Sequence, residues 1–226
     1  MEASGPGVGA AGPPDDLRAG WVQEDLAAEF PRLALLFVSV QASSGRSPRG
    51  VRQRLRLLSD RLRGGQAIVM RQAPIPWAYR VFFRHIGIDP DAQRTPLEAA
   101  VLERLLRGGF KSRNLLDDAL TIALVETGVP FWALDSEAVE GTLGLRAAGA
   151  DETLGRAPQA LPVPAGRLVV ADERSPLAAL FDDVAEGHGV TRHTTHMTLF
   201  TVRVAGVPQI HVEEAMFTCL EILRSG

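Results

Sequence analysis

Residues 112–135 read SRNLLDDALTIALVETGVPFWALD, and the periodicity of their apolar side chains changes at Gly128. Before this glycine the apolar side chains recur at helical spacing and predict a helix over 114–127, with the following side chains inward: Leu116, Ala119, Leu120 and Ala123. Gly128 is a typical residue just past a helix end, and the proline two residues later cannot continue a helix. The apolar run over 130–135 then predicts a strand.

Upstream of this segment the sequence predicts one buried strand over 33–40 and four helices, over 20–29, 48–63, 75–86 and 95–107. The last of these begins with a capping box, in which Thr95 and Glu98 can each accept from the other's backbone N–H. The helix over 48–63 is expected to end at Gly64-Gly65. The helix over 75–86 is expected to pack through four side chains: Trp77, Val81, Phe82 and His85.

Downstream of the segment the sequence predicts strands over 144–147, 167–171 and 196–204, a hairpin turn at 204–207, and a final helix over 212–223. Helices thus come first and strands later, without the regular alternation of a doubly wound sheet. This order predicts an α+β fold.

Composition narrows the class of protein. Hydrophobic residues make up 46% and charged residues 23% of the 226, which is ordinary for a globular chain. The single cysteine, Cys219, excludes an internal disulfide and predicts a core position, a reducing compartment and a cytoplasmic protein. No apolar run reaches the roughly 20 residues of a membrane span.

The sequence predicts one domain behind a tail. Residues 1–18 are expected to be a disordered tail, because residues 1–14 are mostly Gly, Ala and Pro. Residues 19–226 are expected to form one domain. The oligomeric state stays open.

The charge is unevenly distributed along the chain. Between Arg46 and Arg113 there are fourteen arginines and one lysine against five acidic residues, a net charge of +10. The remaining nine basic and 22 acidic residues give −13. A basic block of this kind can bind a phosphate-bearing partner, or it can be a set of solvated helix faces partly paired with the acidic remainder.

Simple catalytic and cofactor motifs are absent from the sequence, so no cofactor is expected and no catalytic residue is assigned. His188, His193 and His196 form the one cluster of potential metal ligands. On a strand, His193 and His196 would point to opposite faces because their spacing is odd. We therefore expect no metal site.

Several short motifs occur in order along the chain: Tyr79-Arg80, Arg84, Gly87-Ile88-Asp89-Pro90, Arg94, Glu98-Ala99, Arg113-Asn114, Asp118, Gly128, Pro130, Ala133-Leu134-Asp135, Val169-Val170-Ala171-Asp172, Gly189-Val190-Thr191 and Thr194-Thr195. This series, over roughly residues 20 to 224, resembles the B3/B4 domain, the module of the bacterial phenylalanyl-tRNA synthetase beta subunit that edits mischarged tRNA. The resemblance implies a three-layer β/β/α sandwich and tRNA as a partner. In the synthetase, the domain hydrolyses tyrosine wrongly attached to the phenylalanine tRNA.

The sequence departs from the synthetase pattern at the editing positions. The synthetase has a Thr-Asn pair at Leu120-Thr121, a histidine at Trp132, a glutamate at Phe200, and an Ala-Gly pair at Leu180-Phe181. Only Thr121 keeps a hydroxyl, and bulky apolar side chains replace the others. The synthetase mechanism therefore does not transfer directly to this chain.

Nine residues are our candidates for contact with tRNA or a ligand: Arg84, Arg94, Arg113, Asn114, Asp118, Thr121, Trp132, Asp135 and Phe200. Structural roles are open for four of them, because Asn114 can cap a helix, Arg113 and Asp118 can form an ion pair, and Asp135 can fix a turn.

The motif series and the basic segment together favour a free-standing tRNA-binding protein, with aminoacyl-tRNA deacylase activity in trans as one possibility. The apolar replacements favour instead a non-catalytic module that binds an amino-acid-like or aromatic small ligand. A third alternative is a partner-binding protein that retains only the fold.

Overall fold

The computed structural model describes residues 16–62, 64–155, 158 and 160–226. Most of the predicted tail, and Arg63, thus lie outside the described residues. In chain order the elements are β1 (Arg18–Ala19), β2 (Trp21–Val22), α1 (Glu24–Glu29), β3 (Ala34–Gln41), α2 (Arg49–Arg61), α3 (Gly64–Gln72), α4 (Pro74–His85), α5 (Pro96–Arg107), α6 (Leu115–Thr127), β4 (Trp132–Asp135), a 3₁₀ turn (Ser136–Ala138), β5 (Gly144–Ala147), β6 (Thr153–Leu154), β7 (Leu161–Pro162), β8 (Leu168–Ala171), β9 (Pro176–Ala179), β10 (His196–Arg203) and α7 (Gln209–Arg224).

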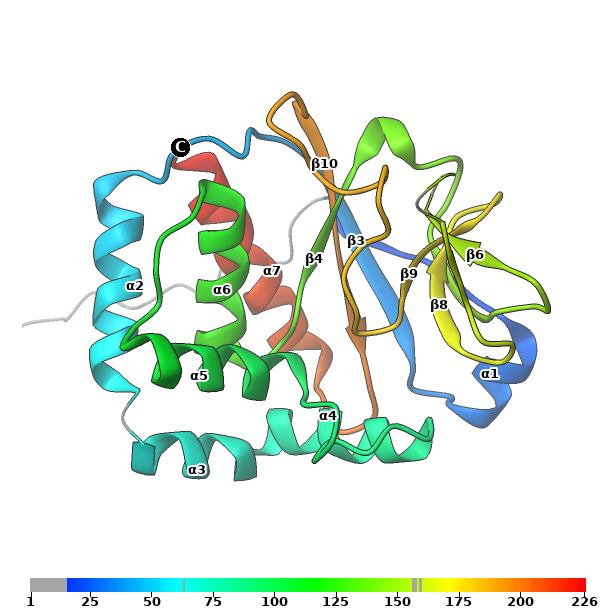
Figure 1. The fold of residues 1–226 in the computed structure, drawn as a ribbon, viewed down its shortest axis with the longest axis horizontal. Coiled ribbons are helices and arrows are strands. Elements are labelled where there is room, and N and C mark those ends of the chain that lie inside the picture. Colours follow the sequence, from blue (N-terminus) through cyan, green and yellow to red (C-terminus); the bar gives the residue numbers. More distant parts are fainter. Residues whose placement is uncertain (1–15, 63, 156–157, 159) are drawn as a thin grey trace, which may run out of the picture.

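These elements form three layers (Figure 1). Helices α2, α6 and α7 stand on one side of a sheet with the strand order β1-β3-β10-β4. A second sheet, with the order β2-β5-β8-β9, lies on the other side of the first. The predicted α+β fold with two β layers and one helical layer is confirmed.

The middle layer is built on the antiparallel pair of long strands β3 and β10, aligned from His196–Gln41 to Arg203–Ala34. Every residue of β10 from Met197 to Val202 is buried. A strand covered on both faces reads as a continuous apolar run, and this is why neither strand shows strict alternation of apolar and polar residues.

Gly20 carries the chain from the first sheet to the second. Its N–H donates to Leu35 O of β3 at 2.8 Å, and the next residue, Trp21, donates to Leu143 O at 3.1 Å. A Cβ at position 20 would lie 2.4 Å from Leu143 O, so only glycine fits this close approach. The predicted helix over 20–29 is therefore wrong at its start, and only Glu24–Glu29 is helical.

The predicted helix boundaries are most accurate where the sequence contains a clear capping residue. Helix α6 begins after Asn114, whose side chain accepts from the Asp117 N–H at 2.8 Å, and it ends at Gly128 with a left-handed φ of 77°. At the start of α5, Glu98 Oε2 accepts from the Thr95 N–H at 3.2 Å. Cys219 is buried in the core, as predicted, and burial raises the pKa of its thiol to about 12.

Helix α2 ends at Arg61, just before Gly64-Gly65 as predicted, but a further helix that was not predicted, α3, begins at Gly64. Two further predictions are wrong. The turn over 204–207 leads from β10 into α7 and closes no hairpin. Of the four side chains predicted to pack from α4, Phe82 is buried and Val81 half-buried, whereas Trp77 is 47% exposed and His85 is exposed. Helix α4 also buries Tyr79 and Phe83, which were not predicted to pack. None of the helices in the part of the chain described is long and apolar enough to cross a membrane.

Candidate functional site

An aromatic cluster lies where the two sheets face each other, and it contains two of the candidate residues. Trp132 of β4 and Phe200 of β10 are partners in the strand register. Their rings stack with centroids 5.7 Å apart and 16° between planes. Trp132 is half-buried and Phe200 is buried. The indole N–H is therefore the only polar side-chain group that this pair can offer a ligand.

Phe181 fills the centre of this cluster. Its ring packs within 6.0 Å of four others, those of Tyr79, Phe82, Phe83 and Trp132. Its backbone φ is 66°, in the left-handed region that bulky residues rarely adopt. The resemblance places a glycine here, and glycine takes this conformation without a steric penalty. Phe181 therefore has the backbone conformation that glycine favours, and its ring occupies space that a glycine would leave empty.

Asp135 stands at the end of β4 and holds the neighbouring loops. Its Oδ1 accepts from the Glu137 N–H at 3.1 Å, and its Oδ2 accepts from the Thr194 hydroxyl at 2.5 Å. Thr194 Oγ1 in turn accepts from the Thr191 N–H at 3.0 Å. Both oxygens of the carboxylate are thus engaged in fixing two turns.

Four candidates meet at the start of α6. Asp118 is buried, and its carboxylate accepts from the hydroxyls of Ser47 at 2.5 Å and Ser112 at 2.6 Å, and from the Arg113 N–H at 3.0 Å. The Arg113 guanidinium pairs instead with Glu103 at 2.8 Å, so the ion pair considered between Arg113 and Asp118 is wrong. Asp118, Arg113 and Thr121 also line a cavity of about 70 Å³.

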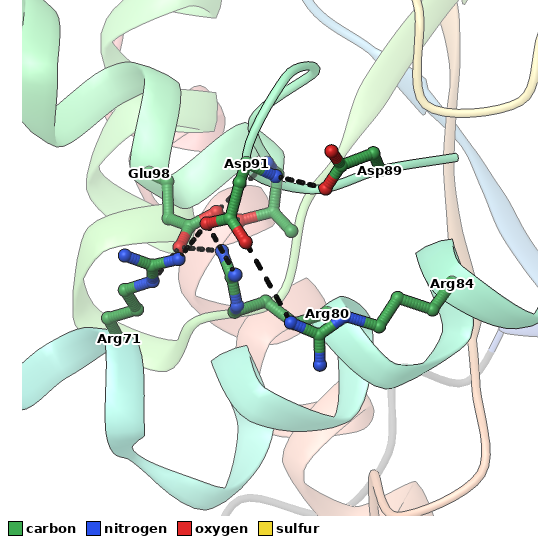
Figure 2. Close-up of polar contacts among 7 residues, drawn as sticks. Arg71, Arg80, Arg84, Asp89, Asp91 and Glu98 are labelled. Carbon is green, nitrogen blue, oxygen red and sulfur yellow. Dashed lines mark hydrogen bonds and ion pairs between the residues drawn. The ribbon is translucent and has the colours of Figure 1, made fainter. Parts of the chain in front are cut away.

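Arg84 belongs to a cluster of charges between α4 and α5 (Figure 2). Arg94 lines the same pocket as three members of this cluster, Arg80, Asp91 and Glu98. At the centre of the cluster the Arg80 guanidinium, only 2% exposed, donates to Glu98 Oε1 at 2.5 Å and Asp91 Oδ1 at 2.9 Å. Arg71 pairs with the same two carboxylates, and Arg84 approaches Asp91 Oδ2 at 3.9 Å. Hydrogen bonding from Arg80 is the main cause that lowers the pKa of Asp91. Burial lowers the pKa of Arg80, but its two carboxylate partners outweigh this and raise it.

Within the residues that the structure describes, most arginines of α2 form no ion pair, unlike the arginines of α3 and α4. Arg54 is paired, with Glu126 at 2.6 Å. The other arginines at or near this helix form no ion pair with any described residue: Arg46, Arg49, Arg52, Arg56 and Arg61. We call these five residues the α2 basic surface. Arg61 also lines an apolar groove of about 690 Å³ formed with α3 and α4.

The histidines do not assemble into a metal site. His188 is buried, whereas His193 and His196 are exposed, with His193 Nε2 accepting from Arg192 Nε at 3.0 Å. Within the described ranges, no group of three or more His, Cys, Asp or Glu side chains could hold a metal ion.

The nine candidates therefore occupy four places and not one site. Trp132 and Phe200 belong to the aromatic cluster, Asp135 to the end of β4, Arg84 and Arg94 to the charged cluster, and the rest to the start of α6: Arg113, Asn114, Asp118 and Thr121. Sequence reasoning missed Arg80 and Ser47 as central contacts. A signal for Arg80 existed, because it follows the buried Tyr79 and precedes Phe82 and Phe83 on the same helix.

Comparison with known proteins agrees with the resemblance to the B3/B4 domain. Residues 78–212 match the model of the B3/4 domain family. The phenylalanine–tRNA ligase beta subunit of Colwellia psychrerythraea is 34% identical over 116 residues, which are 50% of this chain and 14% of that protein. The beta subunit of Nitrosococcus oceani is 32% identical over 114 residues, again 50% and 14%. That of Xanthomonas axonopodis is 41% identical over 68 residues, 30% of this chain and 8% of its own.

The matched segments span only a small part of these ligase subunits. The family model, in contrast, covers more than half of this chain, including the start of α6, the aromatic cluster and all of the charged cluster except Arg71. The chain therefore belongs to the B3/4 domain family.

Proposed function

We propose that this chain is a cytoplasmic tRNA-binding protein whose α2 basic surface contacts the phosphate backbone. The observation that carries the proposal is that the five arginines of this surface have no acidic partner among the described residues, while most other arginines of the basic segment are paired. Unpaired arginines on and next to one helix provide the positive charge and the forked donors that phosphates need.

The geometry of α2 supports such a contact. Arg49, Arg52 and Arg56 are spaced i, i+3 and i+7, so they share one side of the helix. Arg49 and Arg56 are exposed and Arg52 is half-buried. The opposite side of α2 carries Val51, Leu55 and Leu58 into the core, which fixes the orientation of the arginines.

We choose tRNA as the nucleic acid because of the proteins that this chain resembles. Their name, phenylalanine–tRNA ligase beta subunit, states that those enzymes act on tRNA. The aromatic cluster favours binding over editing at the position of the synthetase pocket. Hydrolysis of an ester needs a positioned water and donors for the developing oxyanion, and Trp132, Phe181 and Phe200 provide a packed apolar surface.

The test is tRNA binding as a function of salt. We expect log K to fall linearly with log salt concentration, with a slope of about 0.7–0.9 for each phosphate contacted. The triple change Arg49→Glu, Arg52→Glu and Arg56→Glu should weaken binding and reduce the slope by about 2–3. A matched control with the same change in net charge is Arg174→Glu, Arg192→Glu and Arg203→Glu, on other elements.

The control triple variant should bind more tightly than the α2 variant at low salt, and the difference should shrink as the salt concentration rises. Equal losses in the two variants would show that only net charge matters. Binding that is undetectable at low ionic strength, or independent of salt, would refute the proposal. Circular dichroism of both variants checks that each remains folded.

A further inference from the structure

A pocket of about 320 Å³ lies between α3, α5 and the segment 89–94, outside the α2 basic surface and the aromatic cluster. Its volume is at the lower end of the range for small-molecule sites. The lining combines two kinds of side chain, guanidinium groups from Arg71, Arg80 and Arg94 and apolar groups from Ile68, Leu102 and Leu105.

The polar part of this pocket is held rigid by the protein itself. Arg80 donates to Glu98 Oε1 at 2.5 Å and to Asp91 Oδ1 at 2.9 Å, and Arg71 Nε approaches Glu98 Oε1 at 2.9 Å. Glu98 is fixed further by the Thr95 N–H, and the Asp91 N–H donates to Asp89. Figure 2 shows these side chains converging on Asp91 and Glu98. Such an arrangement exists before any ligand arrives, which lowers the cost of binding.

The charges of the lining do not balance. Three guanidiniums face two carboxylates, and both carboxylates are already engaged by Arg71 and Arg80. Arg94 is exposed and forms no ion pair with any residue in the described part of the chain. The Arg80 Nε is buried without a hydrogen-bond partner. The pocket therefore has one excess positive charge and favours an anion over a cation.

The apolar part of the pocket is left open to solvent. Ile68 is 66% exposed and Leu105 is 40% exposed, although both are large aliphatic side chains. Covering them with an apolar group is favourable because it removes hydrocarbon surface from water. A ligand that is apolar at one end and anionic at the other would satisfy both parts of the lining.

We propose that this pocket binds a small amphipathic carboxylate, with the carboxylate on Arg94 and the apolar part against Ile68 and Leu105. A single unpaired guanidinium matches a single negative charge, and its planar fork matches the two oxygens of a carboxylate. The site lies on α3 and α5 and not on α2, so it is independent of the proposed tRNA binding.

The experiment titrates the full chain with 3-phenylpropionate by isothermal calorimetry. The neutral 3-phenylpropanamide and the dianionic phenyl phosphate serve as comparison ligands. We expect a Kd of about 1 mM or below for the carboxylate. The amide should bind on the order of tenfold more weakly, because a charge-assisted hydrogen bond is lost. Tighter binding of phenyl phosphate than of the carboxylate would overturn the assignment to a carboxylate.

The variants locate the site. Arg94→Gln should lower the affinity for 3-phenylpropionate on the order of tenfold, and Leu105→Gln should lower it several-fold. Arg84→Gln is the matched control, because Arg84 touches the same Asp91 at 3.9 Å and loses the same charge but does not line the pocket. Its affinity should stay within about twofold of the unaltered protein. Equal effects of Arg84→Gln and Arg94→Gln, or no saturation below about 10 mM, would overturn the proposal.

Discussion

Phe181 combines a bulky side chain with a backbone conformation that favours glycine. A glycine at this place would leave a cavity among the rings of Tyr79, Phe82, Phe83 and Trp132, and the left-handed φ of 66° is the conformation that glycine adopts freely. The left-handed backbone conformation of Phe181 costs on the order of 1–2 kcal/mol, and the contacts of its side chain with four rings offset this cost. The sequence alone shows that a bulky side chain replaces the glycine of the family pattern, but it could not predict the backbone conformation or which rings this side chain contacts.

Replacing Phe181 with glycine should therefore open a cavity at a reduced cost in stability. Removal of a buried phenylalanine ring usually costs about 3–5 kcal/mol, and the relief of the left-handed backbone should return roughly 1 kcal/mol. The control is Phe83→Gly, because Phe83 is also buried but lies within α4, where glycine gains no such relief and disfavours the helix. Urea denaturation of both variants measures the difference. A loss in Phe181→Gly as large as that in Phe83→Gly would contradict the account of the backbone.

At the scale of elements, the sequence best predicted those features that depend on neighbouring residues in the chain, such as helix ends. The ends of α6 are encoded by Asn114 and Gly128, and both behave as their residue types suggest. The buried face of α4 was mispredicted because an amphipathic pattern assigns Arg80 to solvent. In the fold, Arg80 is buried because Glu98 and Asp91, which lie beyond the helix, neutralise it. The start of α3 at Gly64 was missed for a related reason, since two glycines disfavour a helix locally.

The link between α2 and α6 depends on one carboxylate. Asp118 joins Ser47, just before α2, to Ser112 and Arg113, just before α6. Asp118→Ala should destabilise the protein by about 2–4 kcal/mol, because it leaves two hydroxyls and a backbone N–H without their shared acceptor. Asp118→Asn should cost less, because it keeps one acceptor oxygen.

The matched control for this prediction is Asp117→Ala, at the neighbouring half-buried aspartate in the same turn. It should cost less than about 1 kcal/mol, the usual worth of an acidic residue near a helix N-terminus. The free energy of unfolding from urea titration orders the three variants. Similar losses for Asp117→Ala and Asp118→Ala would show that Asp118 acts only through the helix dipole.

At the scale of the whole molecule, the resemblance predicted the three layers and the family. The nine candidate residues, however, do not lie together in one site. Motif residues that follow one another in the sequence are separated by the fold into the charged cluster, the start of α6 and the aromatic cluster. Motif order cannot distinguish a residue that stabilises the fold from one that contacts a ligand, and Asp118 and Asn114 belong visibly to the first kind. The free arginines of α2 were visible in the sequence only as charge, because pairing depends on tertiary neighbours such as Glu126 for Arg54.

The whole molecule should not remove tyrosine from phenylalanine tRNA. A site that discriminates by hydrogen bonds to a hydroxyl loses on the order of 10⁴-fold in discrimination without them, and Trp132 and Phe200 replace the polar residues of the synthetase pattern. The ring of Phe181 packs against those of Phe83 and Trp132, so we expect it to reduce the room for an aromatic amino acid beside Trp132. The double change Trp132→His and Phe200→Glu should therefore restore little activity, because it restores polarity and leaves the ring of Phe181 in place.

Release of labelled tyrosine from mischarged phenylalanine tRNA measures this, with a bacterial phenylalanyl-tRNA synthetase as the positive control. We expect the unaltered protein and the double variant to stay at the rate of spontaneous hydrolysis. Adding Phe181→Gly to the double variant is the informative step, because it alone supplies volume; release that appears only in this triple variant would show that the aromatic cluster occupies the editing pocket. Rapid release by the unaltered protein would mean that hydrolysis takes place elsewhere in the domain, and the aromatic cluster would then be part of the core and no vestige of a site.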